Sequence, residues 1–351
     1  MNRPTDTGTA LVDRFGRLHT YLRVSVTDRC NYRCTYCMPA EGHVWLPRNE
    51  VLSHEEIVRI VTVMAGSGLR RVRLTGGEPL LRRGITSLVA AIAAVPGIDD
   101  VSMTTNAHGL AELAGPLAAA GLHRVNISVD SLDPARFARL TRGGQLGAVL
   151  AGVRAAHEAG LGPIKLNMVV MRGENDDEIT SMAAACLPGG LLAGAEETVL
   201  RYIEYMPFAG RWHENVPAGE IRERLRAAGH LEVDAGDLPG VGPATRERWT
   251  PAPRESAPGA SAPSVRVGFI APLTEHFCAR CNRLRLLVDG HLRTCLGYES
   301  TPSLRDVLRG GATDDALLAA IADIVSGKPA GHLAETEGGT AFEGVMTSIG
   351  G

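Results

Sequence analysis

Short apolar, β-branched runs alternate along the chain with longer Ala- and Leu-rich stretches whose apolar residues recur with a helical period. The runs predict strands at residues 22–27, 71–75, 100–105, 124–129, 164–170 and 198–205. The stretches predict helices at residues 53–68, 84–95, 109–120, 133–141, 146–160 and 175–185. Ser53 followed by Glu56 is typical of a capped helix start. Because strands and helices alternate, the pattern predicts β-α units with parallel strands.

Six such units favour the α/β class, either as a doubly wound sheet or as a barrel. No G-x-G-x-x-G turn follows the first strand, which weakens the dinucleotide-binding alternative. Polar residues recur where strands end, at 75–78, 104–106, Ser128 and Glu204. A barrel builds its active site at that edge. We therefore expect an incomplete (β/α)6 TIM-type barrel with an open side for a large substrate.

The character of the chain changes after a helix expected at 217–229. Residues 235–264 are rich in Gly, Pro, Ala and Ser, which predicts a flexible insertion that is dispensable for chemistry. Strands at 265–270, 284–288 and 291–295 and helices at 303–309 and 313–325 then predict a small C-terminal α+β region. The expected organisation is a loose lead-in (1–20), a partial barrel (21–234), the insertion (235–264) and the C-terminal region (265–351).

Composition and charge argue against several classes of protein and partner. With 351 residues, 44% hydrophobic and 21% charged, the chain is typical of a soluble enzyme. A net charge of −3 gives no case for nucleic acid or a membrane surface as a partner. No apolar run reaches the ~20 residues of a membrane helix, and the polar N-terminus lacks a signal core, so we expect a cytoplasmic protein. Six of the seven cysteines fall in two triplets and Cys186 stands alone, which indicates metal ligation rather than disulfides.

The first triplet, Cys30, Cys34 and Cys37, follows the first predicted strand with the spacing C-x₃-C-x₂-C. Thiolates select iron–sulfur clusters or zinc. Three thiolates would leave one iron of a 4Fe–4S cube free to bind a substrate or cofactor. Zinc with His43 as fourth ligand is an alternative, but structural zinc sites usually show paired cysteine knuckles, and no second pair follows here.

The second triplet, Cys278, Cys281 and Cys295, has the spacing C-x₂-C-x₁₃-C, and the hairpin expected at Asp289-Gly290 can bring its members together. A zinc ribbon completed by His276 or His291 is the alternative. The first triplet favours a second cluster with an open iron, facing the first across the barrel mouth.

Two arginines, Arg283 and Arg285, lie between these cysteines on a predicted strand and would project to one face. Paired guanidiniums suit phosphate oxygens. A solvated strand face is the alternative, and the neighbouring cysteines favour substrate contact.

The C-x₃-C-x-aromatic-C loop resembles the radical S-adenosylmethionine (SAM) superfamily. The resemblance implies that Cys30, Cys34 and Cys37 hold a 4Fe–4S cluster whose free iron chelates SAM. Reductive cleavage of the sulfonium would release a 5′-deoxyadenosyl radical. A partial barrel is implied as well.

Nearly the whole chain except 235–264 resembles, more narrowly, the GTP 3′,8-cyclase family of molybdenum-cofactor biosynthesis. The resemblance rests on residues 22–30, 73–79, 126–132 and 277–285 and on the final Gly350-Gly351. It implies that GTP loses the C3′ hydrogen to the radical and that the C3′ radical attacks C8. An electron and a proton then complete (8S)-3′,8-cyclo-7,8-dihydroguanosine 5′-triphosphate.

The resemblance also implies individual roles. The second 4Fe–4S cluster would be held by Cys278, Cys281 and Cys295 and would contact the guanine. GTP contacts would come from Arg23, Arg73, Thr104, Lys165, Arg283, Leu284 and Arg285. SAM contacts would come from Tyr36, Gly77, Ser128 and Met206. Taken singly, Arg23, Arg73 and Lys165 could be salt-bridged charges inside the barrel. Tyr36 and Met206 could be core residues, and Thr104 and Ser128 could be ordinary strand hydroxyls.

Four further positions carry expectations. Glu78 could accept a hydrogen bond from the SAM amine, although packing explains a buried carboxylate equally well. Gly350 and Gly351 would thread into the barrel and aid radical formation, with a mobile end as the alternative. Ala107 stands where the family commonly has Gly, and Ala disfavours a positive φ.

The implied partners are GTP, a reductant protein of unknown identity and a downstream cyclic pyranopterin monophosphate synthase, and a homodimer is compatible with the sequence. A radical SAM modifier of a peptide or other small molecule with one auxiliary cluster is the alternative enzyme. An iron–sulfur electron carrier and a zinc-dependent nucleic-acid module are the non-enzyme alternatives, and the barrel pattern with the acidic charge balance argues against the latter.

Overall fold

The computed structural model describes residues 10–206, 211–234, 243–253, 262–296 and 302–331. Within them an eleven-stranded sheet has the order β11-β10-β1-β2-β3-β4-β5-β6-β9-β8-β7. The strands are β1 (Tyr21–Ser25), β2 (Arg71–Thr75), β3 (Asp100–Thr105), β4 (Arg124–Ser128), β5 (Ile164–Val170), β6 (Thr198–Glu204), β7 (Gly229–Val233), β8 (Glu247–Pro251), β9 (Val265–Ile270), β10 (Arg283–Leu286) and β11 (Leu292–Arg293).

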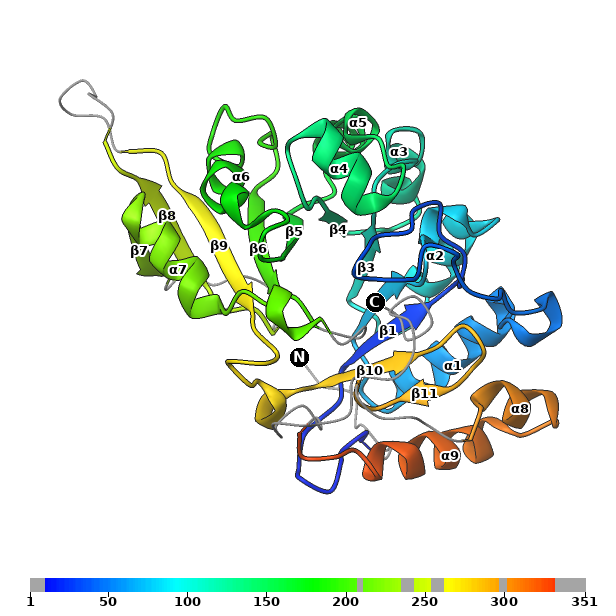
Figure 1. The fold of residues 1–351 in the computed structure, drawn as a ribbon. Coiled ribbons are helices and arrows are strands. Elements are labelled where there is room, and N and C mark those ends of the chain that lie inside the picture. Colours follow the sequence, from blue (N-terminus) through cyan, green and yellow to red (C-terminus); the bar gives the residue numbers. More distant parts are fainter. Residues whose placement is uncertain (1–9, 207–210, 235–242, 254–261, 297–301, 332–351) are drawn as a thin grey trace, which may run out of the picture.

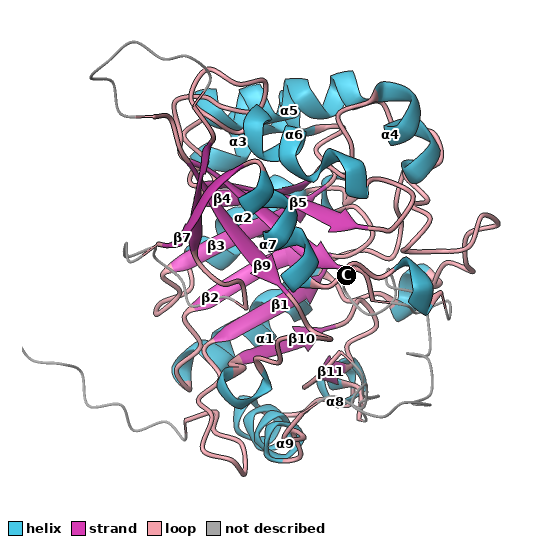
Figure 2. Ribbon diagram, turned by 60° about the vertical axis from the view of Figure 1, so that its left-hand side comes forward, coloured by secondary structure: helices cyan, strands magenta, loops and turns pink. Residues whose placement is uncertain are grey.

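Helices cover the outer face of this curved sheet (Figures 1 and 2). They are α1 (His54–Gly66), α2 (Ile85–Ala93), α3 (Leu110–Ala119), α4 (Pro134–Thr141), α5 (Leu146–Glu158), α6 (Ile179–Ala185), α7 (Ala218–Ala227), α8 (Leu304–Arg309) and α9 (Asp314–Ser326). The expected capping box opens α1, where Ser53 and Glu56 bond each other's backbone amides. No helix in the described part of the chain combines the length and apolar character that crossing a bilayer requires.

The predicted barrel is confirmed. Strands β1 to β6 pair in parallel in sequence order, and their bounds agree with the predicted runs to within two residues. The sheet does not close on itself, because β7 and β11 stand at its two edges. The C-terminal strands extend the barrel on both sides: β10 pairs in parallel with β1, and β9 pairs in parallel with β6.

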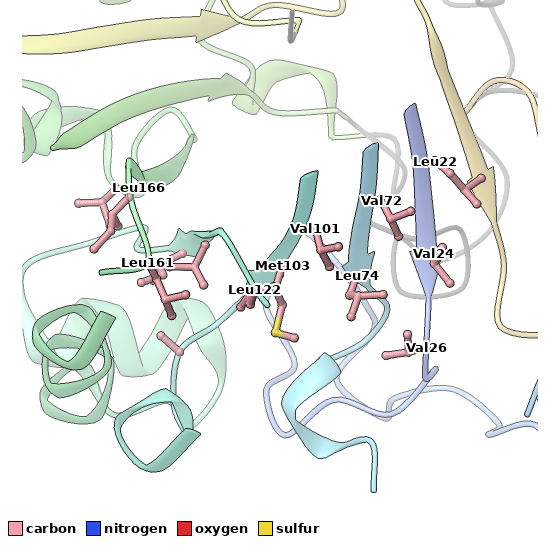
Figure 3. Close-up of a cluster of buried hydrophobic side chains, with 14 of the residues drawn as sticks. Leu22, Val24, Val26, Val72, Leu74, Val101, Met103, Leu122, Leu161 and Leu166 are labelled. Atoms are coloured by element: carbon pink, nitrogen blue, oxygen red, sulfur yellow. The ribbon is translucent and has the colours of Figure 1, made fainter. Parts of the chain in front are cut away.

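The two faces of the barrel strands differ sharply. Every second residue along a barrel strand packs into the apolar core under the helices, as Leu22, Val24, Val72 and Leu74 do (Figure 3). The alternate residues face the barrel interior and are mostly polar or charged. Because side chains alternate along a strand, the same short segments build both a dry core and a polar chamber.

One expectation about the C-terminal part was wrong. Residues 235–264 were expected to be a flexible insertion, yet strand β8 lies within this range and pairs with β7 and β9. Trp249 of β8 is 1% exposed and donates its indole N–H to the Leu225 carbonyl at 2.9 Å. The composition argument failed because five strand residues were averaged with the Pro- and Ser-rich stretches around them. The domain limits drawn from the sequence stay predictions.

The lead-in is also more ordered than expected from residue 10 onward. Val12 and Leu18 pair as an antiparallel bridge, and Asp13 accepts a 3.0 Å hydrogen bond from His19 inside the small hairpin that results. We call residues 10–20 the N-terminal hairpin.

The turn after β3 adopts the conformation that its sequence disfavours. Ala107 has φ +58° and is fully buried, with its amide bonded to the Thr105 hydroxyl at 2.9 Å. A left-handed alanine costs roughly 1 kcal/mol relative to the usual helical region. The hydrogen bond and the surrounding core hold it there.

Replacing Trp249 with Ala tests whether β8 belongs to the core. We expect the free energy of unfolding to fall by about 3–5 kcal/mol, because a large buried side chain and a satisfied indole N–H are both lost. Denaturant unfolding measures the change, with Thr250→Ala on the same strand as the control. A loss below about 1 kcal/mol would return 243–253 to the status of a dispensable insertion.

Candidate active site

The first cysteine triplet lies on the loop that leaves β1 at the carboxyl edge of the sheet. Cys30, Cys34 and Cys37 are each partly exposed, and Asp130 lies near enough to influence Cys34. The loop is held by backbone bonds from Arg33 to the Thr141 carbonyl at 3.0 Å and within the triplet from Cys37 to Cys34 at 2.9 Å. The short segment is therefore fixed at several points before any ligand binds.

The chemistry of the triplet suits a cationic partner. Burial raises the pKa of Cys30 to about 11 and also raises the pKa of Cys34 well above its usual value. Two nitrogens point toward the Cys30 sulfur, the Tyr32 amide at 3.4 Å and the Asn106 side chain at 4.0 Å. Buried thiols that are oriented by donors become thiolates when a metal supplies positive charge.

The glycine turn after β2 packs directly on the cysteine loop. A Cβ on Gly76 would collide with the Thr27 carbonyl, and one on Gly77 would collide with the Arg29 carbonyl. The amides of Gly77 and Glu78 donate to those same carbonyls at 2.7 Å. The turn therefore needs glycine to approach the backbone before Cys30, a reason that the sequence analysis did not foresee.

Glu78 lies beside this turn, and hydrogen bonds hold its carboxylate in place. Its carboxylate accepts from the Leu80 amide at 3.0 Å, the Thr105 hydroxyl at 2.6 Å and the Asn106 amide at 2.7 Å. Burial raises its pKa to about 7 in spite of these bonds. The contacts favour the packing interpretation of Glu78, because they join the turns after β2 and β3.

The other expected SAM contacts also gather at the carboxyl edge. Ser128 is the last residue of β4, and Met206 follows β6 by two residues. Tyr36 donates its hydroxyl to Asp130 at 2.8 Å, which ties the cysteine loop to the end of β4. Burial raises the pKa values of both partners, that of Asp130 to about 6.

The barrel interior holds a band of buried and half-buried cations, which we call the basic band. The parallel registers place Arg285, Arg23 and Arg73 side by side on β10, β1 and β2. Lys165 on β5 and Arg201 on β6 complete the band across the chamber. The predicted convergence of Arg23, Arg73 and Lys165 from three strands is therefore present.

Neutral groups orient the band. Arg73 donates to the Ser102 hydroxyl at 3.1 Å, and Arg201 donates to the Asn167 side chain at 2.9 Å. With its amide oxygen turned toward the two guanidiniums, Asn126 accepts from Arg201 at 3.1 Å and from Arg73. The Thr104 hydroxyl lies 3.4 Å from the same amide group.

The basic band is electrostatically strained. Burial and the neighbouring cations lower the pKa of Lys165 to about 7, that of Arg201 to about 9 and that of Arg285 to about 10. The pKa of Arg23 is lowered for the same two reasons. A polyanion in the chamber would relieve both the desolvation and the mutual repulsion.

The second triplet lies at the opposite edge of the sheet. Cys278 and Cys281 precede β10, which runs parallel to β1, whereas Cys30 follows β1. The two triplets were expected to face each other across the barrel mouth, and this was wrong: they stand at opposite ends of the strands, with the basic band between them. The direction of β10 is the reason, since a residue before a parallel strand lies at the amino edge.

Cationic groups surround these cysteines. Lys328 lies with its ammonium 3.6 Å from the Cys281 sulfur, and Arg285 interacts with both Cys281 and Cys295. Although burial alone would raise it, Arg283 and Lys328 bring the pKa of Cys281 down to about 7. Cys281 is therefore poised to ionise.

Single-ion sites are not formed by either triplet. No three His, Cys, Asp or Glu side chains in the described ranges converge so that one metal ion could bind. Zinc requires that convergence, whereas each thiolate of a 4Fe–4S cube binds a separate iron. His291, one of the zinc-ribbon candidates, pairs instead with Asp289 at 3.0 Å.

One predicted side chain does not face the barrel interior. Leu284 points away from Arg283 and Arg285 and is fully buried in the apolar core, so its side chain is withheld from a ligand. Gly350 and Gly351 lie outside the described residues. Sequence reasoning missed Arg201, Asn126 and Lys328; the first two share the inner face of predicted strands and could have been found by the alternation alone.

The fold and the first cysteine loop define the chain as a radical SAM protein: residues 24–186 match the Radical SAM superfamily, and residues 198–334 match Molybdenum Cofactor Synthesis C. Among solved structures, Streptococcus suis SuiB bound to the precursor peptide SuiA has a similar fold, with a TM-score of 0.58 and 14% identity over 96% of this chain and 77% of that one.

Curated relatives narrow the class. The GTP 3′,8-cyclase of Moorella thermoacetica is 44% identical over 342 residues, which cover 97% of this chain and 99% of the relative. That of Listeria monocytogenes is 42% identical over 326 residues, which cover 92% of each. The chain belongs to the GTP 3′,8-cyclase family.

The lowered pKa of Lys165 predicts a pH-dependent penalty on stability. Its folded value of about 7 lies below the unfolded value of about 10.4, so the buried charge destabilises the free protein at and below pH 7 and the penalty is relieved between these values. We expect Lys165→Met to raise the free energy of unfolding by about 1 kcal/mol or more near pH 7. Denaturant titrations at pH 6.5 and 9.5 should show the two proteins converging at the higher pH; parallel curves would contradict this.

Proposed function

We propose that this chain converts GTP to 3′,8-cyclo-7,8-dihydro-GTP for molybdenum-cofactor biosynthesis, with GTP in the basic band and SAM at the carboxyl edge of the barrel. The observation that carries the proposal is the basic band itself, which lies between two thiol triplets at opposite ends of the strands. The family of the chain supplies the reaction.

The triphosphate fits the charge of the chamber. Arg23, Arg73, Lys165 and Arg285 were assigned to GTP from the sequence, and Arg201 adds a further cation on β6. Guanidinium groups bind phosphate oxygens in pairs. Asn126 and Ser102 hold the guanidiniums in place, so little side-chain order has to be created on binding. Thr104, beside Asn126, would hydrogen-bond the ligand.

The residues at each triplet fit a 4Fe–4S cluster, with Cys30, Cys34 and Cys37 at the carboxyl edge and Cys278, Cys281 and Cys295 at the amino edge. Clusters held there would supply the electron for SAM cleavage at the carboxyl edge and an iron able to bind the guanine at the amino edge. The protein's part is to hold both reactants in reactive geometry and to exclude water from the radical. Because the triplets lie at opposite ends of the strands, SAM would lie at the carboxyl edge of the sheet and the guanine at the amino edge.

At the carboxyl edge, Ser128, Met206, Tyr36 and the Gly77 backbone would line the SAM site. Tyr36 and Gly77 also fix the cysteine loop, so each would contribute both to SAM and to the cluster ligands. Glu78 would contribute mainly by joining the turns after β2 and β3 and has at most one lone pair left for the SAM amine.

A peptide or neutral small molecule is the competing substrate class. The similarity to SuiB, whose structure contains a precursor peptide, concerns the fold alone. Several cations that repel one another suit a polyanion, which would lower that repulsion, whereas a neutral peptide would not. The basic band therefore favours a nucleoside triphosphate.

The decisive test combines GTP, SAM and dithionite with anaerobically reconstituted protein and reads the products by mass spectrometry. We expect the cyclised nucleotide and 5′-deoxyadenosine from a protein with about eight irons per chain. Cys281→Ala should lose about half of the iron and all nucleotide product while still cleaving SAM. Cys30→Ala should abolish SAM cleavage as well.

The lone Cys186 supplies a matched control, because it is buried in the core apart from both triplets. Cys186→Ala should keep the full iron content and both activities. Unchanged GTP in the presence of SAM cleavage, or full cyclase activity in Cys281→Ala, would refute the proposal.

A further inference from the structure

The N-terminal hairpin is organised around one buried carboxylate. Asp13 accepts from the amides of Phe15 at 2.9 Å and Arg17 at 3.1 Å, from the Arg17 Nε at 2.6 Å and from His19 at 3.0 Å. Its side chain is fully buried, and that of Arg17 is 8% exposed. The hairpin therefore presents one rigidly held guanidinium to the rest of the chain.

The free edge of that guanidinium joins two distant segments. Arg17 donates to the Cys278 carbonyl at 2.8 Å, to the Pro329 carbonyl at 2.6 Å and to the Ala330 carbonyl at 3.0 Å. Cys278 opens a single 3-10 turn, Cys278–Arg280, which precedes β10. A planar fork with fixed donors is suited to holding carbonyls from two chains in one arrangement.

A second buried cation, Lys328, contacts the same loop. Lys328 follows α9, is 2% exposed and donates to the Arg283 carbonyl at 2.7 Å, with the Cys281 sulfur 3.6 Å away. Asn282 adds a bond to the Thr20 hydroxyl at 3.2 Å. The loop from Cys278 to Arg283 is thus fastened by the N-terminal hairpin and by the segment after α9.

We propose that Arg17 and Lys328 are positioning residues that hold the second thiol loop in its ligand-ready conformation, so that the N-terminal hairpin is a structural part of that site. This inference rests on the proposed second cluster. A three-residue turn has little stability of its own, so the two cations have to supply the order that ligand convergence requires. In the part of the chain that the structure describes, Arg17 and Lys328 contact the second thiol loop and not the first. The effect of replacing them should therefore be confined to the second site.

Hydrogen exchange of the metal-free protein tests the inference directly. The variants are Arg17→Gln and Lys328→Met, and the control is Arg14→Gln, an exposed arginine of the same hairpin whose guanidinium stacks on Phe15. We expect amides in peptides covering 276–283 to exchange about tenfold faster in both variants, since charge-assisted hydrogen bonds are lost. Peptides covering 30–38 serve as the reference within each molecule.

Anaerobic reconstitution provides the second readout. Both variants should retain SAM cleavage and lose the iron of the second site, whereas Arg14→Gln should match the unaltered protein. Unchanged exchange at 276–283 together with full iron content would overturn the inference. If Arg17→Gln fails to fold, the exchange at 276–283 and the iron content of Lys328→Met alone test the inference. If the unaltered protein itself holds only one cluster, the second-cluster proposal fails, while the exchange ratios still report whether the two cations hold the loop.

Discussion

The structure depends on a strict division between the two faces of the barrel strands. The outward residues of β1, β2 and β3 are aliphatic and pack beneath the helices, while their neighbours in sequence carry charge into the interior. Burial of cations costs free energy, which the lowered pKa of Lys165 registers. Packing of the aliphatic face offsets that cost. The barrel can therefore keep several cations close together in its interior, where an anion would bind favourably.

Strand direction then determines where the two cysteine triplets lie. β1 leads toward Cys30, and its neighbour β10 leads away from Cys281, although the two strands are parallel and in register. Arg23 and Arg285 are partners in that register, so they stand between the triplets. A single strand pairing thus connects the two thiol sites and two cations of the basic band, and a ligand that reaches both triplets has to pass these cations.

Local patterns predicted what depends on local sequence. Runs such as 71–75 and 100–105 became strands with the same bounds, because β-branched residues and the turns that flank them determine these segments. Arg201 follows the same alternation and was overlooked within an apolar run. Lys328 could not have been found, since its role depends on α9 ending beside β10. β8 was obscured by its surroundings, and the amino-edge position of Cys278 required the direction of β10, which periodicity does not reveal.

The glycine turn shows why a functional role cannot be assigned from loss of activity alone. Gly77 was expected to contact SAM, yet the space for its missing Cβ is taken by the Arg29 carbonyl, next to Cys30. Any side chain there would displace the first thiol loop before it met SAM. Glu78 and Tyr36 raise the same issue, because each fastens this loop or the turn beside it. Tyr36 and Gly77 are both proposed SAM contacts and observed supports of the first thiol loop, so a substitution that removes the proposed contact necessarily loosens the loop.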